Sequence, residues 1–270
     1  MNEADYEQIK LAIKAVTGVD LEFYKPNQMN RRLDSYVGRV ADGSITKFIH
    51  LIKSDQTAGE ALKDFLTINV TEFFRDPHAW DELKKSILPG LLESGRPLNI
   101  WSAGCSQGSE PYTLSMILDE MAPRRQHTIL ATDLDAGVLE RARNAGPYSL
   151  SELKNFSSGQ LAMWFEKQEN DTYKVAKHIR NRVTVKRQNL LLDAFETGFD
   201  LIVCRNVVIY FSDIAKRRLN ERFLTSLKPG GYFFIGGTET LLDAASIGFE
   251  RCATSFYRRG LATTNVAKAA

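Results

Sequence analysis

The stretch "LNIWSAGCSQGSEPYTL" (residues 98–114) decides the fold. A short apolar run ends in small residues and Gly104, and the pattern after it predicts a helix that begins near Ser109. Gly104 and Gly108 would let a ligand approach the backbone, although both would also suit a tight turn without a ligand. The turn is not G-x-G-x-x-G, and no Lys-Ser/Thr pair follows as in a P-loop. A dinucleotide site and a triphosphate site are therefore both disfavoured.

The alternation of strand and helix continues to the C-terminal end of the chain. Apolar runs predict strands, and helical patterns follow the first three of them. The predicted strands are "LNIWSAG" (98–104), "HTILATDLD" (127–135), "FDLIVCRNVVIYF" (199–211) and "GGYFFIGG" (230–237), with a closing strand or hairpin in "FERCATSFYRR" (249–259). This order predicts an α/β domain with a mainly parallel sheet covered on both faces. Residues 168–190 interrupt it with alternating apolar and polar positions, which predict a small antiparallel insertion.

Residues 1 to about 70 are predicted to be helical, with no convincing strand. Tyr6, Ile9, Ile13 and Val16 share one face of the first helix. Further helices are expected over 26–41, 44–55 and 58–69, the second of these with Ser44 as its N-cap. The chain is thus expected to contain a helical domain followed by an α/β domain.

Composition excludes several classes of protein. The 270 residues carry a formal net charge of only +2, so no global field drives the chain onto nucleic acid. The three cysteines form no C-x-x-C pair and indicate neither a metal site nor a disulfide framework. The start of the chain does not resemble a signal peptide, and no apolar run has the roughly 20 residues needed to span a bilayer. We expect a cytoplasmic protein without membrane insertion.

Polar residues stand where the predicted strands end. Asp133 follows the second strand, where a carboxylate can bind both hydroxyls of a ribose or can instead cap a helix. Arg205 and Asn206 interrupt an apolar run, so they are expected to face a ligand or an internal hydrogen-bond network. Glu110 falls in the first turn of a helix, a position that the helix dipole alone would favour. These residues converge because parallel strands deliver their loops to one edge.

Together these pieces resemble the class I S-adenosylmethionine-dependent methyltransferases. The motifs "NVTEFFRDP" (69–77), "WSAGCSQGSEPYTL" (101–114), "ATDLD" (131–135) and "CRNVVIYF" (204–211), in this order, resemble the CheR family of chemotaxis receptor methyltransferases. The resemblance covers nearly the whole chain. It implies a doubly wound seven-stranded sheet, an all-helical N-terminal domain and a small antiparallel β-subdomain.

The resemblance also implies domain boundaries. The helical substrate-recognition domain would span 1–68, and a linker with a cofactor-covering loop would span 69–96. The methyltransferase domain would span 97–260, with the β-subdomain at about 168–188, and a flexible tail would span 261–270. Phe73 and Phe74 are expected to anchor the covering loop in the core.

The family's site residues can be placed on matching motifs. The implied cofactor contacts are Asn69, Thr71, Arg75, Glu110, Asp133, Asn189, Leu190, Arg205 and Asn206. Among them, Arg75 would pair with the methionine carboxylate of the cofactor and Asp133 would hold its ribose. Tyr210 would lie near the transferred methyl group, and Tyr210 and Arg75 are the candidates for positioning the incoming carboxylate. No metal is implied.

The implied reaction transfers a methyl group from S-adenosylmethionine to glutamate side chains of chemoreceptors, leaving S-adenosylhomocysteine. A glutamate with a pKa near 4.3 is already a carboxylate nucleophile at neutral pH, so no general base is needed. The sulfonium methyl group is activated in the cofactor itself. The four histidines fall in none of the candidate motifs, which agrees with such a mechanism.

The implied partner is an acidic helical bundle of a methyl-accepting chemoreceptor. The segment "KPNQMNRRLDSYVGR" (25–39) contains Arg31, Arg32 and Arg39, which could form a docking face or only a solvated helix face. Some family members bind a tethering peptide through a glycine-containing loop, but the corresponding "AKHIRNR" (176–182) contains no glycine. We therefore expect that the enzyme does not need the tether. We also expect a monomer.

Three alternatives remain open. A nucleic-acid methyltransferase is disfavoured by the low charge and by the lack of an Asn/Asp-Pro-Pro-aromatic motif where "CRNVVIYF" stands. A sensor of S-adenosylmethionine would keep Asp133 and Glu110 but transfer nothing. A nicotinamide oxidoreductase is disfavoured by the "AGCSQG" turn (103–108).

Overall fold

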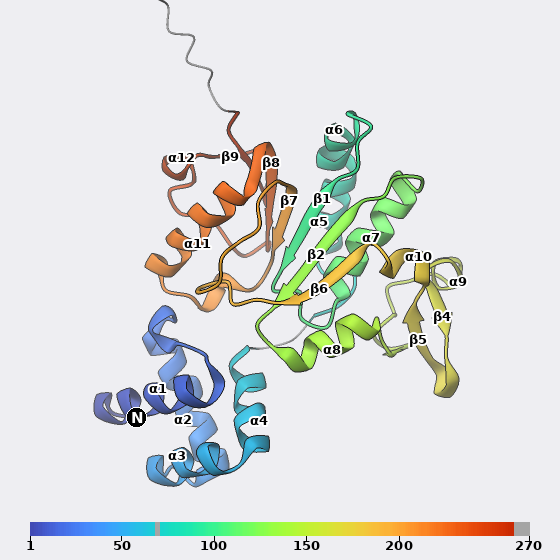
Figure 1. Ribbon diagram of the computed structural model, residues 1–270. Coiled ribbons are helices and arrows are strands. Elements are labelled where there is room, and N and C mark those ends of the chain that lie inside the picture. Colours follow the sequence, from blue (N-terminus) through green and yellow to red (C-terminus); the bar gives the residue numbers. More distant parts are fainter. Residues whose placement is uncertain (68–70, 262–270) are drawn as a thin grey trace, which may run out of the picture. The chain divides into compact units, whose positions relative to one another are not determined.

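The computed structural model describes residues 1–67 and 71–261. The chain divides into two compact units (Figure 1). One unit combines Met1–Val70 with Val208–Arg218, and the other combines Thr71–Val207 with Leu219–Ala270. A segment from the second half of the chain thus belongs to the N-terminal unit, which the sequence does not predict.

The N-terminal unit is helical, as the sequence predicts. Its elements before residue 68 are α1 (Glu3–Thr17), η1 (Leu21–Phe23), α2 (Pro26–Ala41), α3 (Ile45–Ser54) and α4 (Gln56–Thr67). The expected N-cap is confirmed, because the Ser44 side chain accepts a hydrogen bond from the Lys47 amide. The C-cap of α1 is Gly18, whose φ of 74° is in the left-handed region that glycine adopts without strain.

The predicted apolar stripe of α1 is buried except at its last position. Ile9 and Ile13 are fully buried, whereas Val16 is 36% exposed. Val16 lies at the rim of the core, against Gly59 of α4. A Cβ atom at Gly59 would come within 2.9 Å of Val16 Cγ1. The missing side chain at Gly59 therefore lets α1 and α4 pack closely.

The second unit is built on a seven-stranded sheet in the order β6-β2-β1-β7-β8-β10-β9. The strands are β1 (Asn99–Ala103), β2 (Thr128–Asp133), β6 (Val183–Arg187), β7 (Phe199–Cys204), β8 (Leu227–Ile235), β9 (Phe249–Arg251) and β10 (Phe256–Arg259). The first five in spatial order are parallel, and β10 is antiparallel to both of its neighbours. Chain order reverses between β1 and β7, which is the point where doubly wound sheets bind ligands.

Successive residues of each strand point to opposite sides of the sheet, and apolar side chains pack against both faces. On one face, Ile100 and Phe234 pack with Trp80 and Leu114 in the main apolar cluster. On the other face, the ring of Trp101 contacts Phe195, Phe199 and Phe223, the last from α11 (Asp213–Ser226). Other helices of this unit are α7 (Ser109–Met121), α8 (Ala136–Asn144), α10 (Lys177–Arg180) and α12 (Ala244–Ile247). Figure 1 shows β6, β2, β1 and β7 side by side.

The expected linker 69–96 is largely helical from residue 77 onward. It forms α5 (Pro77–Glu82), the π-helical η2 (Leu83–Ile87) and α6 (Leu88–Leu92). These helices bury Trp80, Leu83 and Leu88 in the core of the sheet unit. Residues 71–96 therefore belong structurally to the sheet unit.

A small antiparallel sheet is present, but its strands differ from those expected. It contains β3 (Tyr148–Ser149), β5 (Thr172–Val175) and β4 (Phe165–Lys167), in that order, with α9 (Ser158–Trp164) preceding β4. The small antiparallel insertion is confirmed, but of the predicted range 168–190 only β5 belongs to it. Val183 and Val185 lie instead in β6, which runs parallel to β2. An alternating pattern marks a half-buried strand but does not say which sheet receives it.

The described residues contain no helix long and apolar enough to cross a membrane. Within 1–67 and 71–261, no cluster of three or more His, Cys, Asp or Glu side chains could hold a metal ion. Cys105 and Cys204 are buried free thiols, and Cys252 is exposed.

Candidate active site

The turn after β1 closes against the end of β2. The amides of Gly104 and Cys105 both donate to the Thr132 carbonyl, at 2.8 and 2.9 Å. Gly104 has a φ of 83°, and a Cβ atom there would lie 2.3 Å from Val207 Cγ2. Only glycine fits this position, so the turn can bring its backbone close to whatever occupies the edge of the sheet.

Asp133 is the last residue of β2. One carboxylate oxygen accepts from the Ser106 amide at 2.8 Å and the other from the Asp135 amide at 3.0 Å. The alternative in which Asp133 caps the next helix is wrong, since Asp135 is the N-cap of α8. Burial raises the pKa of Asp133 above its ordinary value, although the two amides favour the charged form. Asp133 is thus held at the sheet edge by the glycine-rich turn.

Glu110 lies in the first turn of α7, as the sequence predicts. Its Oε1 accepts from Ser102 Oγ at 2.8 Å, and its Oε2 lies 3.8 Å from Arg205 Nη1. Burial raises the pKa of Glu110 to about 7, against the opposing effects of Arg205, Ser102 and Arg75. The raised pKa shows that the partners of Glu110 do not offset the cost of burying its charge. A positively charged ligand nearby would therefore stabilise the ionised carboxylate.

Arg205 joins the end of β7 to the segment that follows residue 70. Its Nη2 donates to the Arg75 carbonyl at 2.8 Å and to Asp76 Oδ2 at 2.7 Å. The guanidinium lies over the rings of Trp80 and Phe234, 5.1 and 4.8 Å from their centroids. Its side chain is 2% exposed. The structure therefore supports the internal network that the sequence left open for Arg205, with Glu110 as the link to the sheet edge.

Asn206 contacts Glu239, a residue at the sheet edge that the sequence interpretation missed. Asn206 adopts a φ of 60°, and its amide donates to Glu239 Oε2 at 3.0 Å. The same oxygen accepts from the Gly236 amide at 2.7 Å, just past the end of β8. A Cβ atom at Gly236 would lie 2.7 Å from this oxygen. A glutamate three residues after a glycine-ended strand is the signal that could have found Glu239.

Asn189 and Leu190 reach the same edge from β6. The Gln188 amide donates to the Asp133 carbonyl at 2.8 Å, which places the next two residues beside the end of β2. The Asn189 side chain accepts from the Leu191 amide at 2.9 Å and so shapes a turn. Leu190 is 8% exposed. The structure therefore brings a polar turn and an apolar side chain to the neighbourhood of Asp133.

The segment that begins at Thr71 is anchored by its aromatic residues, as predicted. Phe73 is 1% exposed and contacts the rings of Tyr148, Phe156 and Phe165. Phe74 packs against Trp80 and Phe156, and its amide donates to Thr113 Oγ1 at 3.3 Å. Thr71 and Arg75 are half-buried. Asn69 lies outside the described residues.

Tyr210 belongs to the helical unit. It lies in η4 (Val208–Tyr210), and its carbonyl accepts from the Lys25 amide at 3.0 Å. The Arg32 guanidinium lies 5.5 Å from the centre of the Tyr210 ring and donates to the Phe65 carbonyl at 2.5 Å. Arg32 is half-buried, and burial lowers the pKa of Arg32 despite the opposing effect of Tyr210. Its contacts are thus directed into its own unit.

The two other predicted docking arginines are exposed on α2. Arg31 and Arg39 both present their side chains to solvent. The Arg39 guanidinium also lies over the rings of Tyr36 and Phe65, at 5.1 and 5.8 Å. These contacts orient the side chain without neutralising its charge.

The sheet edge fits S-adenosylmethionine chemically. Gly104 leaves no room for a side chain, Asp133 presents a carboxylate that can accept from ribose hydroxyls, and Glu110 would favour a cationic ligand. Strand order and site together define a class I methyltransferase that uses S-adenosylmethionine.

Comparisons with known proteins refine this class. The description "CheR methyltransferase, all-alpha domain" matches residues 4–67, and "CheR methyltransferase, SAM binding domain" matches residues 69–257. The chain therefore belongs to the CheR methyltransferase family. The predicted cofactor and fold class are confirmed.

Curated relatives span almost the same length. A "Chemotaxis protein methyltransferase" of Listeria monocytogenes is 38% identical, over 94% of this chain and 97% of the relative. A "Chemotaxis protein methyltransferase 1" of Pseudomonas aeruginosa is 35% identical, over 88% and 90%. A solved structure, PKMT2 from Rickettsia typhi in complex with AdoHcy, is 22% identical over 51% of this chain and 20% of that chain, with a TM-score of 0.33.

Proposed function

We propose that this enzyme methylates glutamate side chains of chemoreceptors, giving glutamyl methyl esters and S-adenosylhomocysteine. The observation that carries the proposal is the match, over 94% of the chain, to a relative named chemotaxis protein methyltransferase. The exposed Arg31 and Arg39 on α2 also support it, because they suit an acidic partner. The enzyme would act in the cytoplasm, where the receptor's signalling bundle is accessible.

The acceptor chemistry asks little of the protein beyond positioning. Bound S-adenosylmethionine supplies a sulfonium methyl group that is already activated for transfer. A glutamate acceptor is ionised at neutral pH and needs no base to remove a proton. No histidine of the described residues is among those gathered at the sheet edge. The protein's task is then to align the carboxylate oxygen with the methyl group and sulfur, and to exclude water.

The proposed cofactor-binding roles agree with the positions of those side chains that the structure describes. Asp133 would accept from the ribose hydroxyls, and the turn of Asn189 and Leu190 would lie against the adenine. Glu110 would attract the positive charge of the cofactor. Asn69, Thr71, Arg205 and Asn206 complete the proposed set.

Arg75 and Tyr210 are the proposed catalytic residues. Arg75 would pair with the methionine carboxylate, since its backbone is fixed by donors from Arg205 and from Trp80 Nε1, both at 2.8 Å. Tyr210 would lie near the methyl group and orient the incoming carboxylate. Neither residue is assigned a proton transfer.

Recognition of the receptor is proposed to depend on Arg31, Arg32 and Arg39. Arg31 and Arg39 are exposed and would steer the acidic bundle by long-range attraction. Arg32 would contribute from its half-buried position, where its Nη1 atom is buried without a hydrogen-bond partner.

The enzyme is also proposed to work without a receptor tether and as a monomer. The segment after β5 forms α10 and contains no glycine between residues 176 and 182. A tight complex with an isolated peptide from a receptor's C-terminus, measured by calorimetry, would contradict independence from a tether.

The decisive experiment uses the purified enzyme, methyl-labelled S-adenosylmethionine and membranes that bear chemoreceptors. Label that enters the receptor and leaves as methanol in mild base identifies a glutamyl methyl ester. Arg75→Ala should abolish labelling, whereas Arg124→Ala, at an exposed arginine after α7, should not. If the enzyme binds the cofactor but labels no receptor, the acceptor assignment is wrong and the family assignment stands.

A further inference from the structure

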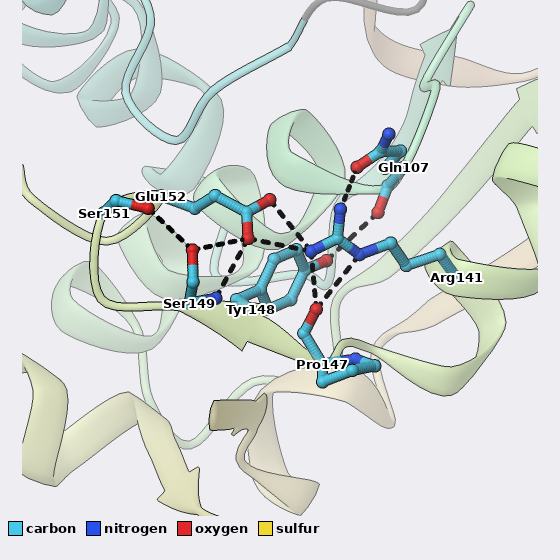
Figure 2. A network of polar contacts seen from close by, with 7 residues as sticks. All are labelled: Gln107, Arg141, Pro147, Tyr148, Ser149, Ser151 and Glu152. Carbon is cyan, nitrogen blue, oxygen red and sulfur yellow. Dashed lines mark hydrogen bonds and ion pairs between the residues drawn. The ribbon is translucent and has the colours of Figure 1, made fainter. Parts of the chain in front are cut away.

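Arg141, in the middle of α8, connects two distant parts of the chain (Figure 2). Its Nη1 donates to Gln107 Oε1 in the glycine-rich turn. Its Nε and Nη2 donate to the Pro147 carbonyl, at 3.0 and 2.5 Å. Nη2 also lies 2.8 and 3.0 Å from the two carboxylate oxygens of Glu152. One guanidinium therefore holds the turn on one side and the start of the small sheet on the other.

Tyr148 of β3 makes a second connection to the same turn. Its hydroxyl donates to the Gln107 carbonyl at 3.0 Å, and its ring lies 4.9 Å from the Arg141 guanidinium. Tyr148 is 1% exposed. Both the side chain and the carbonyl of Gln107 are thus fixed from outside the turn, as Figure 2 shows.

Glu152 is the counterion of Arg141. It accepts from the amide and the hydroxyl of Ser149, at 2.9 and 3.0 Å. Burial opposes its charge, but the hydrogen bonds from Ser149 and the charge of Arg141 hold the pKa of Glu152 below its ordinary value. The carboxylate is therefore charged at neutral pH and can orient the guanidinium in a fixed plane.

The turn that Arg141 fixes is the one that meets the cofactor edge. The Ser106 amide, next to Gln107, donates to Asp133. α8 begins three residues after Asp133, so the helix that follows the ribose carboxylate also holds the glycine-rich turn. Movement of Gln107 would move the Ser106 amide and with it the carboxylate.

We propose that Arg141 is a positioning residue for S-adenosylmethionine. It fixes the glycine-rich turn through Gln107 and makes the turn's position depend on the docking of residues 147–152. Cofactor affinity is then sensitive to the small antiparallel sheet, which acts through the glycine-rich turn. This inference rests on cofactor binding at the sheet edge and is independent of which acceptor is methylated.

The test measures binding of S-adenosylhomocysteine by titration calorimetry. Arg141→Gln should weaken binding about tenfold, because a charged fork with several acceptors is lost. Arg143→Gln is the matched control. Arg143 lies on the same helix and contacts only Glu140, at 3.6 Å, among the ion pairs of the described residues. Its substitution should leave the affinity unchanged.

A double-mutant cycle separates positioning from a general loss of stability. If Arg141 acts through Gln107, then Gln107→Ala and Arg141→Gln should weaken binding by less together than the product of their separate effects. Arg141→Lys should restore part of the affinity, and it replaces Arg141→Gln in the cycle should that variant not fold. Wild-type affinity in the Arg141 variant, or independent effects of the two substitutions, would overturn the proposal. The receptor-labelling experiment can fail without affecting this result.

Discussion

Buried carboxylates at the two ends of the seven-stranded sheet differ in how many hydrogen-bond and charged partners they have. At the amino end of β7, Asp200 is 1% exposed and is surrounded by donors. It contacts Arg96 at 2.6 Å, Lys228 at 2.9 Å and the Asn99 amide at 2.8 Å. At the carboxyl end, Glu110 has one short hydrogen bond and an arginine 3.8 Å away.

The pKa values follow the partners. Burial opposes the charge of Asp200, yet Arg96, the Asn99 amide and Lys228 hold its pKa below the ordinary value. Burial raises the pKa of Glu110 to about 7, since its partners are too few to offset desolvation. The comparison teaches that a satisfied buried carboxylate stabilises the fold, whereas an under-compensated one is available for a ligand.

Substitution of Asp200 should give the largest effect of those predicted, and it should change stability without changing cofactor affinity. Asp200→Asn removes the charge that pairs with Arg96 and Lys228 and should lower the free energy of unfolding by about 3 kcal/mol. Because the folded pKa of Asp200 is depressed, this stabilisation is present above its unfolded pKa of about 3.9 and is lost as the pH falls below it. Urea denaturation at pH 7 measures the loss.

The control for Asp200 is an exposed aspartate of the same unit. Asp81 is 57% exposed and lies 3.8 Å from Lys85, so Asp81→Asn should change stability by less than about 0.5 kcal/mol. Cofactor affinity should stay unchanged in both variants. A large loss of affinity in Asp200→Asn would break the division between the two ends of the sheet.

Asp133 should show the reverse pattern, with affinity affected more than stability. Asp133→Asn removes the charge that would accept from the ribose hydroxyls, and binding should weaken by about 10–100-fold. Asp135→Asn is the matched control, because asparagine is as good an N-cap as aspartate. Calorimetric titration with S-adenosylhomocysteine compares them. Equal affinities in the two variants would remove Asp133 from the site.

Much of the proposed cofactor site can be predicted from the sequence, because parallel strands bring their carboxyl ends to one edge of the sheet. Gly104 and Asp133 lie at or near the ends of predicted strands and Arg205 interrupts an apolar run, and the structure brings all three to that edge. Their positions depend on local signals, namely apolar runs and the residues that end them. The anchoring of Phe73 follows equally from a local pattern in a chain that must bury its aromatic rings.

Contacts between distant loops could not be predicted in this way. Glu239 bonds two backbone amides and Arg141 holds Gln107, but neither pairing leaves a periodic signal in the chain. The assignment of Val183 and Val185 to the antiparallel insertion failed for the same reason, since alternation does not identify a strand's partner. Helical periodicity also could not show that the predicted linker 69–96 contains a segment around Trp80 that packs in the core.

Glu110 should make cofactor binding depend on pH. A cationic ligand favours the charged carboxylate, so binding should release a proton and should weaken by up to about tenfold per pH unit below 7. In the free enzyme, the raised pKa means that stability contributed by Glu110 is full below about pH 4.3 and is lost as the pH rises through 7. Affinity measured from pH 6 to 8 tests the ligand effect. Glu110→Gln should flatten the profile, and a flat profile in the wild type would contradict the assignment.

His127, at the amino end of the sheet, should affect only stability, and its substitution should give the smallest change of those predicted. Its Nδ1 accepts from the Leu98 amide at 3.0 Å, and burial, with help from Arg182 and Arg125, lowers the pKa of His127 to about 4. The unfolded chain therefore binds the proton first, so stability is full above about pH 6.5 and falls as the pH drops toward 4. Between pH 7 and 5.5 the wild type should lose about 1 kcal/mol more than His127→Asn, whose side-chain oxygen can still accept from Leu98. Urea denaturation at the two pH values measures this difference. Since His127 lies at the opposite end of the sheet from the proposed cofactor site, His127→Asn should leave the pH dependence of cofactor affinity unchanged.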